Sequence, residues 1–124
     1  MTARVARPFN RRMPETPTLP VLALVRDLMF ASRISAEARA AGTQVRVVRD
    51  PALLGEAEGR RLLVDLNLPG AIEAASGWGA RTGGEVVGFV SHVDAATAAA
   101  ARQAGVGRVL ARSRFVELLP ELLR

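Results

Sequence analysis

RLLVDLNLPG, at residues 61–70, joins a short apolar run to an acidic residue and then to a Pro-Gly pair. The run at residues 62–64 has the length and the apolar composition of a strand buried in a parallel sheet. Asp65 follows this run directly, and the Pro-Gly pair is a common turn signal. The segment therefore predicts a buried strand that delivers a carboxylate to the edge of a sheet.

Short apolar runs of this kind alternate with longer helical patterns along the rest of the chain. Such alternation is typical of βαβ units wound around a parallel sheet, so it predicts a doubly wound α/β domain of three layers. We expect strands at residues 21–25, 45–48, 61–64, 86–90 and 108–111. We expect helices at residues 28–41, 51–58, 71–76 or slightly beyond, 94–104 and 114–123.

The ends of these helices are indicated by residues that favour helix caps. Gly42 and Gly105 follow the first and fourth helices, where a glycine readily takes the left-handed conformation. Asp50, Asp94 and Ser113 precede helices and are expected to act as N-caps, because their side chains accept hydrogen bonds from the first helical amides.

Two further positions give structural expectations. Pro120 falls inside the last predicted helix, where a proline removes one backbone donor and crowds the preceding turn, so we expect a kink or a short, broken final helix. Trp78 lies in a glycine-rich stretch, and we expect it to be a partly buried anchor. Contact with a partner protein is the alternative for Trp78, because tryptophan is favoured at interfaces.

Length and composition narrow the class of protein. The chain has 124 residues, which corresponds to one domain, and its mean hydropathy is +0.17. No apolar run approaches the ~20 residues that span a membrane, and the basic N-terminal residues lack the apolar region of a secretory signal. The chain has no cysteine and so cannot form the disulfides that are common in extracellular proteins. We therefore expect a cytoplasmic protein with no membrane contact.

Positive charge is concentrated at the start of the chain. All 17 basic residues are arginine, the net charge is +5, and four of the arginines fall within residues 1–12. The remainder carries 13 arginines against 12 acids. Residues 1–20 also contain four prolines, so we expect a flexible basic leader followed by one domain at residues 21–124. Nucleic acid is a disfavoured partner, because the other arginines are interspersed with acids.

Polar side chains follow several of the predicted strands. In an open parallel sheet the carboxyl ends of the strands gather at one edge, where ligands bind. No nucleophile beside a base and no histidine cluster is visible there, so we do not expect an enzyme. We expect His92 to be a solvated side chain. The residues predicted at this edge are Arg26, Asp27, Asp65, Ser91, His92, Arg112 and Ser113.

The segment at residues 62–70 resembles the phosphoacceptor segment of response-regulator receiver domains, in which a strand ends in an aspartate followed by a Leu-X-Leu/Met-Pro-Gly turn. The resemblance extends over roughly residues 21–124, in the right order and at nearly the right spacing. It implies a flavodoxin-like α/β fold with a five-stranded parallel sheet of order 2-1-3-4-5.

The resemblance also implies roles for individual residues. Asp65 would be the phosphoryl acceptor, and Ser91 would supply the hydroxyl that meets the phosphoryl group. Asp27, Asp65 and the backbone carbonyl of Asn67 would be the ligands of a magnesium ion. Arg112 takes the position of the family's lysine and would contact the phosphoryl group in its place.

The sequence departs from the receiver pattern at three positions. Arg26 stands where the family has the first acid of a pair, Arg112 replaces the lysine, and Ser113 replaces a proline. A guanidinium close to Asp27 and Asp65 would compete with a divalent cation for their carboxylates. We therefore expect Arg26 to act as a built-in counter-ion, and magnesium to bind poorly.

These observations favour a stand-alone, receiver-like signalling domain whose aspartate phosphorylation is weakened or absent. It would act on another protein, a kinase or an effector, or form a homodimer through the last two helices and the strand at residues 108–111. The alternative is a conventional single-domain phosphoacceptor in a phosphorelay, in which Asp65, Asp27 and Ser91 keep their roles. A purely structural interpretation also stays open, because Asp65 could simply begin a turn and Ser91 could cap a helix.

Overall fold

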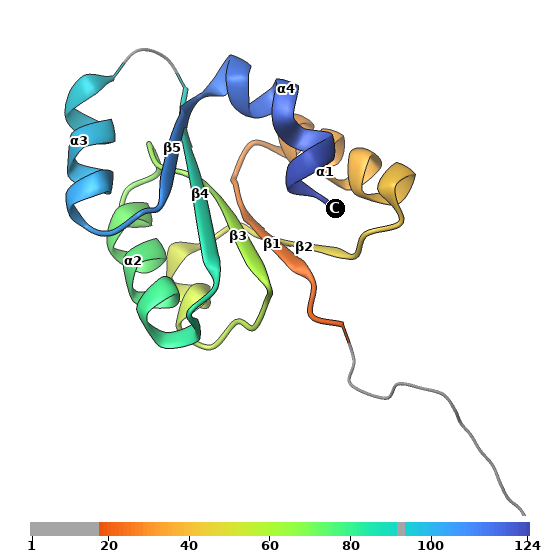
Figure 1. The fold of residues 1–124 in the computed structure, drawn as a ribbon, viewed down its shortest axis with the longest axis horizontal. Helices are drawn as coiled ribbons and strands as arrows, with labels where there is room; N and C mark the ends of the chain where they lie inside the picture. The colour runs from red at the N-terminus through yellow and green to blue at the C-terminus, as the bar shows by residue number, and fades with distance from the viewer. Residues whose placement is uncertain (1–17, 92–93) are drawn as a thin grey trace, which may run out of the picture.

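A computed structural model describes residues 18–91 and 94–124. Most of the predicted leader at residues 1–20 lies outside these described residues, and so does His92. Within the described part, the chain forms one parallel sheet (Figure 1). Its strands are β1 (Val21–Leu24), β2 (Val45–Val48), β3 (Arg61–Asp65), β4 (Glu85–Val90) and β5 (Arg108–Ala111).

The strand order is β2-β1-β3-β4-β5, and every neighbouring pair is parallel. This order confirms the predicted flavodoxin-like topology. The strands that lie inside the sheet are almost completely buried, as expected for strands covered by helices on both faces.

The helices cover the two faces of the sheet unequally (Figure 1). One face packs against α1 and α4 through a core that includes Ile34 and Phe115. The other face packs against η2, α2 and α3 through a core that includes Leu54 and Trp78. The helices are α1 (Leu28–Ala41), the 3-10 helix η2 (Pro51–Gly55), α2 (Ala71–Thr82), α3 (Ala95–Gln103) and α4 (Arg112–Leu122).

Most of the predicted helix caps are confirmed. Gly42 ends α1 in the left-handed conformation, with φ of 71°. Gly105, which follows the C-cap of α3, also has a positive φ, of 97°. The side chain of Asp50 accepts a hydrogen bond at the start of η2, and that of Asp94 does so at the start of α3.

Two predictions about the last helix are wrong. Ser113 does not cap α4, because the helix already begins at Arg112 and its N-cap is Ala111, without a side-chain hydrogen bond. Pro120 does not break the helix, which continues through it to Leu122. The proline lies in the last turn and is exposed, so few hydrogen bonds follow it, while Leu119 and Leu122 on either side of it are buried.

The predicted helix at residues 51–58 is also corrected, to the five-residue 3-10 helix η2. Within η2 only Leu54 is buried, so no apolar stripe supports a second turn. Helix α2, in contrast, extends six residues beyond the end that we predicted, to Thr82. Trp78, in this added part, is 1% exposed, so it is buried more completely than the partly buried anchor that we expected.

The end of the chain is fastened to residues far away in the sequence. The Thr43 hydroxyl donates a hydrogen bond to the carbonyl of Leu123, and the Arg61 guanidinium donates one to the carbonyl of Leu122. Leu122 and Leu123 themselves belong to the core that covers β1. None of the helices described is both long and apolar enough to cross a membrane.

Candidate functional site at the carboxyl edge of the sheet

Three of the predicted site residues lie at the ends of three adjacent strands. Asp65 is the last residue of β3 and is in register with Phe89 of β4, two residues before Ser91. Leu24, which ends β1, is in register with Val64, the residue before Asp65. The topology therefore brings Asp27, Asp65 and Ser91 to the same edge, which we call the carboxyl edge.

Asp65 is half-buried and begins a turn that leads into α2. Its Oδ1 atom accepts a hydrogen bond of 3.0 Å from the backbone N–H of Asn67. Its carbonyl accepts a second bond of 3.3 Å, from the N–H of Leu68. Gly70 completes the turn with φ of 81°, a left-handed conformation that disfavours residues with a Cβ. Asp65 thus has the turn-starting geometry that its residue type alone would favour.

Asp27 connects β1 to α1 and is the N-cap of that helix. Its Oδ1 atom accepts hydrogen bonds from the N–H groups of Met29, at 2.9 Å, and of Phe30, at 3.2 Å. Its Oδ2 atom lies 3.9 Å from Nη2 of Arg112. The Asp27 side chain is 56% exposed, so this ion pair is a loose one and contributes little to stability.

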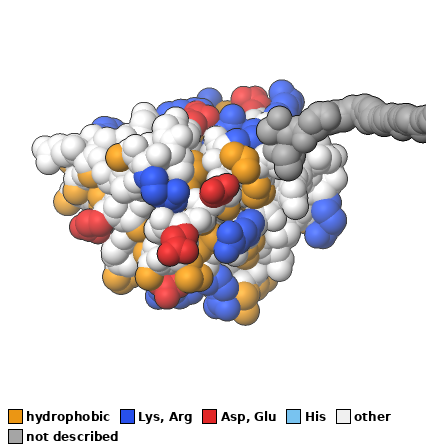
Figure 2. Space-filling view, turned by 90° about the horizontal axis from the view of Figure 1, so that it is seen from below, with side chains coloured by type: hydrophobic (Ala, Val, Ile, Leu, Met, Phe, Trp, Pro, Cys, Tyr) orange, Lys and Arg blue, Asp and Glu red, His pale blue; other side chains and the backbone are white. Residues whose placement is uncertain are grey.

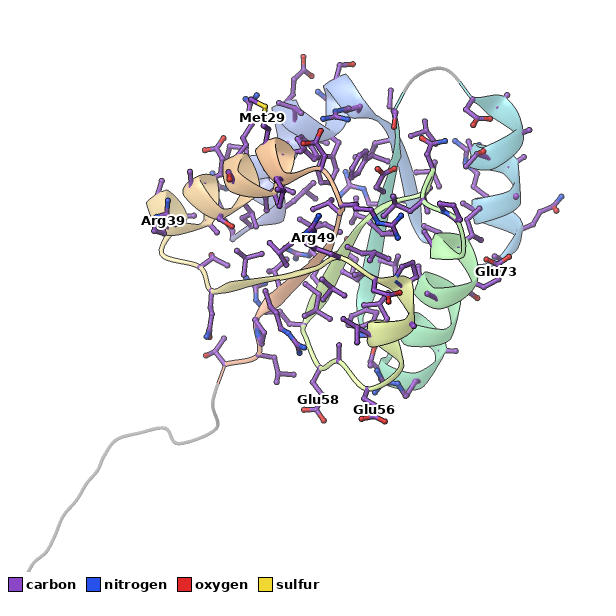
Figure 3. The ribbon with its side chains drawn as sticks, turned by 180° about the vertical axis from the view of Figure 1, so that it is seen from behind. Met29, Arg39, Arg49, Glu56, Glu58 and Glu73 are labelled. Atoms are coloured by element: carbon purple, nitrogen blue, oxygen red, sulfur yellow. The ribbon has the colours of Figure 1, made fainter. Side chains whose placement is uncertain are left out.

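Arg26 does not make the contact that we expected. Its Nε donates a hydrogen bond of 3.4 Å to the backbone carbonyl of Arg49, and Nη2 of Arg49 donates one of 3.3 Å to the carbonyl of Arg26. Figure 3 labels Arg49, which follows the end of β2. Among the described residues, no ion pair within 4.0 Å joins Arg26 to an acid. The guanidinium that faces an acid at this edge is that of Arg112.

Arg112 is held in place by an aromatic side chain. Its guanidinium carbon lies 4.2 Å from the centroid of the Phe30 ring, which is a cation–π geometry. The Phe30 ring in turn makes an edge contact with Phe89, at 5.3 Å between centroids. The Arg112 side chain is 36% exposed, so it keeps access to solvent at the carboxyl edge.

Asn67 links two loops of the carboxyl edge through its side chain. Its Oδ1 atom accepts a hydrogen bond of 2.7 Å from the backbone N–H of Ser91, and its Nδ2 atom donates one of 3.1 Å to Oδ2 of Asp94. Asp94 also accepts bonds from the N–H and the hydroxyl of Thr97 in α3. The turn that holds Asp65 is therefore tied to the start of α3.

Two of these contacts have no signal in the sequence. The resemblance implies a role for the backbone carbonyl of Asn67, whereas in the structure its side chain joins Ser91 to Asp94. No pattern in the sequence points to Arg49, although it contacts Arg26 just after the end of β1. The sequence predicts that Asp94 caps a helix, as it does in the structure, but it does not predict the hydrogen bond between Asp94 and Asn67.

The side chains at the carboxyl edge fit a magnesium ion poorly. Magnesium prefers an octahedral set of oxygens, usually with one or two carboxylates among them. One oxygen of Asp27 is engaged by two backbone N–H groups, and the other faces Arg112. In residues 18–91 and 94–124, no group of three acidic, histidine or cysteine side chains could hold a metal ion. Asp65 and the Asn67 carbonyl alone offer fewer ligands than the resemblance implies.

Comparison with known proteins identifies the fold. No family model and no curated sequence matches the chain. A response regulator from Burkholderia pseudomallei, solved with a phosphorylated aspartic acid, calcium and citrate, aligns with a TM-score of 0.71 at 19% identity, over 86% of this chain and 66% of that one. A CheY-like receiver domain from Methanospirillum hungatei JF-1 gives 0.71 at 14% identity, over 86% and 94%. An orphan response regulator of H. pylori gives 0.68 at 14%, over 87% and 100%.

Proposed function

We propose that this chain, which has the fold of response-regulator receiver domains, is a signalling domain that acts by contact with another protein and whose phosphorylation at Asp65 is weak or absent. The observation that carries the proposal is the state of Asp27, which caps α1 with one oxygen and faces Arg112 with the other. The carboxylate that would help to hold a divalent cation is already engaged.

Charge at the carboxyl edge supports the same proposal. Phosphoryl transfer depends on positive charge that is correctly placed around the transferring group, and a metal ion normally supplies much of it. Here Arg26 is fixed on the Arg49 carbonyl and Arg112 on the Phe30 ring. Both arginines repel a divalent cation, and neither contacts Asp65 in an ion pair within 4.0 Å.

The test uses a small phosphodonor with magnesium, followed by intact mass. We expect at most slow, partial addition of one phosphoryl group to the native chain. Arg26→Asp, which supplies the missing acid next to Asp27, should accelerate the addition, and Asp65→Ala in that background should abolish it. Arg46→Asp is the matched control, because Arg46 is an exposed arginine of the edge strand β2. Rapid, complete phosphorylation of the native chain at Asp65 would contradict the proposal.

A conventional phosphoacceptor is the second candidate. It is favoured by the position of Asp65, Ser91 and Asp27 at the ends of three adjacent strands. In this case Arg112 would donate hydrogen bonds to a phosphoryl oxygen, as an arginine does in other phosphate contacts. The same mass experiment separates the two candidates, since this one requires the native chain to react without any substitution.

The partner is another protein, a kinase or an effector, and we propose no catalytic activity of the chain itself. A homodimer through α3, β5 and α4 is a further part of the proposal, because β5 is the last strand of the sheet and carries the exposed Arg108. Light scattering over a range of protein concentrations tests it, and a monomer at every concentration would exclude it.

Nucleic acid is not part of the proposal. On the face shown in Figure 2, basic and acidic side chains are interspersed and form no single basic patch, although nucleic-acid binding surfaces usually carry one. Most of the basic leader lies outside the described residues, so truncation of residues 1–17 in a salt-dependent binding assay is the direct test. A cytoplasmic location, consistent with the absence of cysteine, completes the proposal.

A further inference from the structure

The connection between β2 and β3 is held against α2 by side chains of that helix. The indole N–H of Trp78 donates a hydrogen bond of 3.1 Å to the carbonyl of Ala57. The guanidinium of Arg81 donates bonds of 3.0 Å and 2.9 Å to the carbonyls of Leu54 and Ala57. These bonds fix the position of η2, and a groove remains between η2 and the edge strand β2.

This groove has a volume of about 470 Å³ and an apolar surface. Leu53, which lines it, is 56% exposed and is one of four large apolar residues found exposed in the described part of the chain. Arg46 lies on its β2 side, because Val48, two residues further along the strand, belongs to the core beneath η2. We call it the η2 groove, and it is lined by Arg46, Ala52, Leu53, Gly55, Glu56 and Ala57.

Two carboxylates are available at the η2 groove. Glu56 lines it, Glu58 follows closely in the chain, and both residues are exposed. Figure 3 labels both side chains, which point away from the sheet at the lower edge of the view. Among the residues that the structure describes, no cationic group lies within 4.0 Å of either carboxylate. The groove therefore combines apolar surface with acidic groups that can attract a basic occupant.

The N-terminal end of the described chain lies beside these acids. The backbone N–H of Arg60 donates a hydrogen bond of 3.0 Å to the carbonyl of Pro20. Gly59 is so close to the same carbonyl that an added Cβ would lie 2.8 Å from its oxygen. Residues 1–17 precede this point, and an extended chain covers about 3.3 Å per residue. The leader is therefore long enough to reach every part of the η2 groove.

We propose that residues 1–17 occupy the η2 groove of their own chain. This segment has four arginines against one acid, so its charge is complementary to that of Glu56 and Glu58. It also contains large apolar residues that can cover Leu53, and these are Val5, Phe9 and Met13. The inference goes beyond the proposed function, because it involves neither phosphorylation nor a kinase.

The covalent connection favours the chain's own leader over other occupants. Exposed ion pairs contribute little each, so a separate basic peptide would bind the η2 groove weakly. A short flexible connection, in contrast, gives an effective concentration of about a millimolar. A second copy of the chain supplies its leader only at the concentration of the protein. While the leader is bound, it also excludes a partner protein from the groove.

The experiment uses the full chain with one spin label on the leader. The sequence contains no cysteine, so Ala6→Cys can be modified with a nitroxide at a single site. We expect the nitroxide to broaden the backbone amide signals of Arg46 and residues 52–58 strongly. Residues 42–44 are the internal reference, because they lie beside Thr18 and outside the η2 groove. Their signals should be broadened less, whereas a leader without a preferred site would broaden both sets alike.

Charge variants test the electrostatic part of the proposal. Glu56→Arg with Glu58→Arg should lower the ratio of docked to free leader by about 3-fold or more. Arg46→Glu should have the opposite effect, because it replaces a repelling charge on the groove by an attracting one. Glu73→Arg with Glu121→Arg is the matched control, since it makes the same change in net charge at exposed acids of α2 and α4 that do not line the groove.

Two further measurements separate charge from apolar contact. Salt at 1 M reduces the Debye length to about 3 Å, so it should decrease the broadening of residues 52–58. Leu53→Ser should decrease it as well, without any change in charge, because it removes exposed apolar surface from the groove. All the substituted side chains are exposed, and Trp78 fluorescence checks that each variant is folded.

Three results would overturn the proposal. The first is equal broadening of residues 42–44 and 52–58, and the second is a pattern that Glu56→Arg with Glu58→Arg leaves unchanged. The third comes from a mixture in which one chain carries the nitroxide and another carries the isotope label. Broadening of residues 52–58 in that mixture would assign the groove to the leader of a second copy.

Discussion

Substitution of Asn67 by alanine tests whether the carboxyl edge is held together as the structure shows. The change removes the bond from Ser91 N–H, at 2.7 Å, and the bond to the Asp94 carboxylate, at 3.1 Å. A neutral hydrogen bond contributes about 0.5–1.5 kcal/mol, and one to a charged group about 1.5–3 kcal/mol. All three residues are only half-buried, so water replaces part of what is lost. We expect the free energy of unfolding to fall by about 1–3 kcal/mol.

The entropy of unfolding relates this loss of free energy to a decrease in Tm. At about 2.1 cal/mol/K per residue, a chain of 124 residues loses roughly 4 °C of Tm for each kcal/mol. Asn67→Ala should therefore lower Tm by about 4–12 °C. In urea, the midpoint should fall while the m-value stays the same, because the surface exposed on unfolding does not change.

Trp78 provides the assay. It is the only tryptophan in the sequence, there is no tyrosine, and the residue is 1% exposed, so its fluorescence should change when unfolding exposes the indole to water. The control is Arg114→Ala, which removes an exposed ion pair with Glu117 at 3.0 Å and should change stability by less than about 1 kcal/mol. If Asn67→Ala destabilises the chain no more than Arg114→Ala does, the reasoning about the Asn67 link is refuted.

Three further substitutions test the packing. Gly88→Ala should lower the free energy of unfolding by about 1–3 kcal/mol in a urea titration, because its Cβ would lie 2.6 Å from the side chain of Leu66; an unchanged midpoint would contradict this. Pro120→Ala should raise Tm measured by calorimetry, because the exposed proline interrupts the hydrogen bonds of α4, and a lower Tm would mean that the proline is stabilising. Trp78→Phe, followed by circular dichroism, should cost at least about 1 kcal/mol, since it removes the indole hydrogen bond to the Ala57 carbonyl; no loss would show that bond to be unimportant.

The strands and the first helix could be predicted from the sequence because local and long-range signals agree there. The interior strands are apolar runs of the right length, and α1 lies between an aspartate and a glycine that act as its caps. The bounds predicted for α1 match the structure, as do those for β2 and β5. The bounds of α1 are marked by its two capping residues, which have strong conformational preferences. The bounds of β2 and β5 could be predicted because their apolar runs are short.

Prediction failed where a side chain had several possible contact partners, because the sequence does not show which of them it contacts. Arg26 could have paired with Asp27 or Asp65, but its long side chain instead reaches the Arg49 carbonyl at the neighbouring edge strand. The contact of Arg112 with Phe30 depends on how α4 is placed over α1, which no local pattern encodes. The candidate site could therefore be located from the sequence, but its hydrogen bonds and ion pairs could not be assigned.

The anchoring of the chain's end has a consequence for synthesis. The face of β1 that carries Val21 and Ala23 is covered in part by Leu119, Leu122 and Leu123. A ribosome makes the chain from the amino end, so the part of this face that the leucines cover stays exposed to water until the last of them has emerged. The nascent chain consequently exposes apolar residues of β1 to water until α4 has been translated, and we expect this part of the core to close only then.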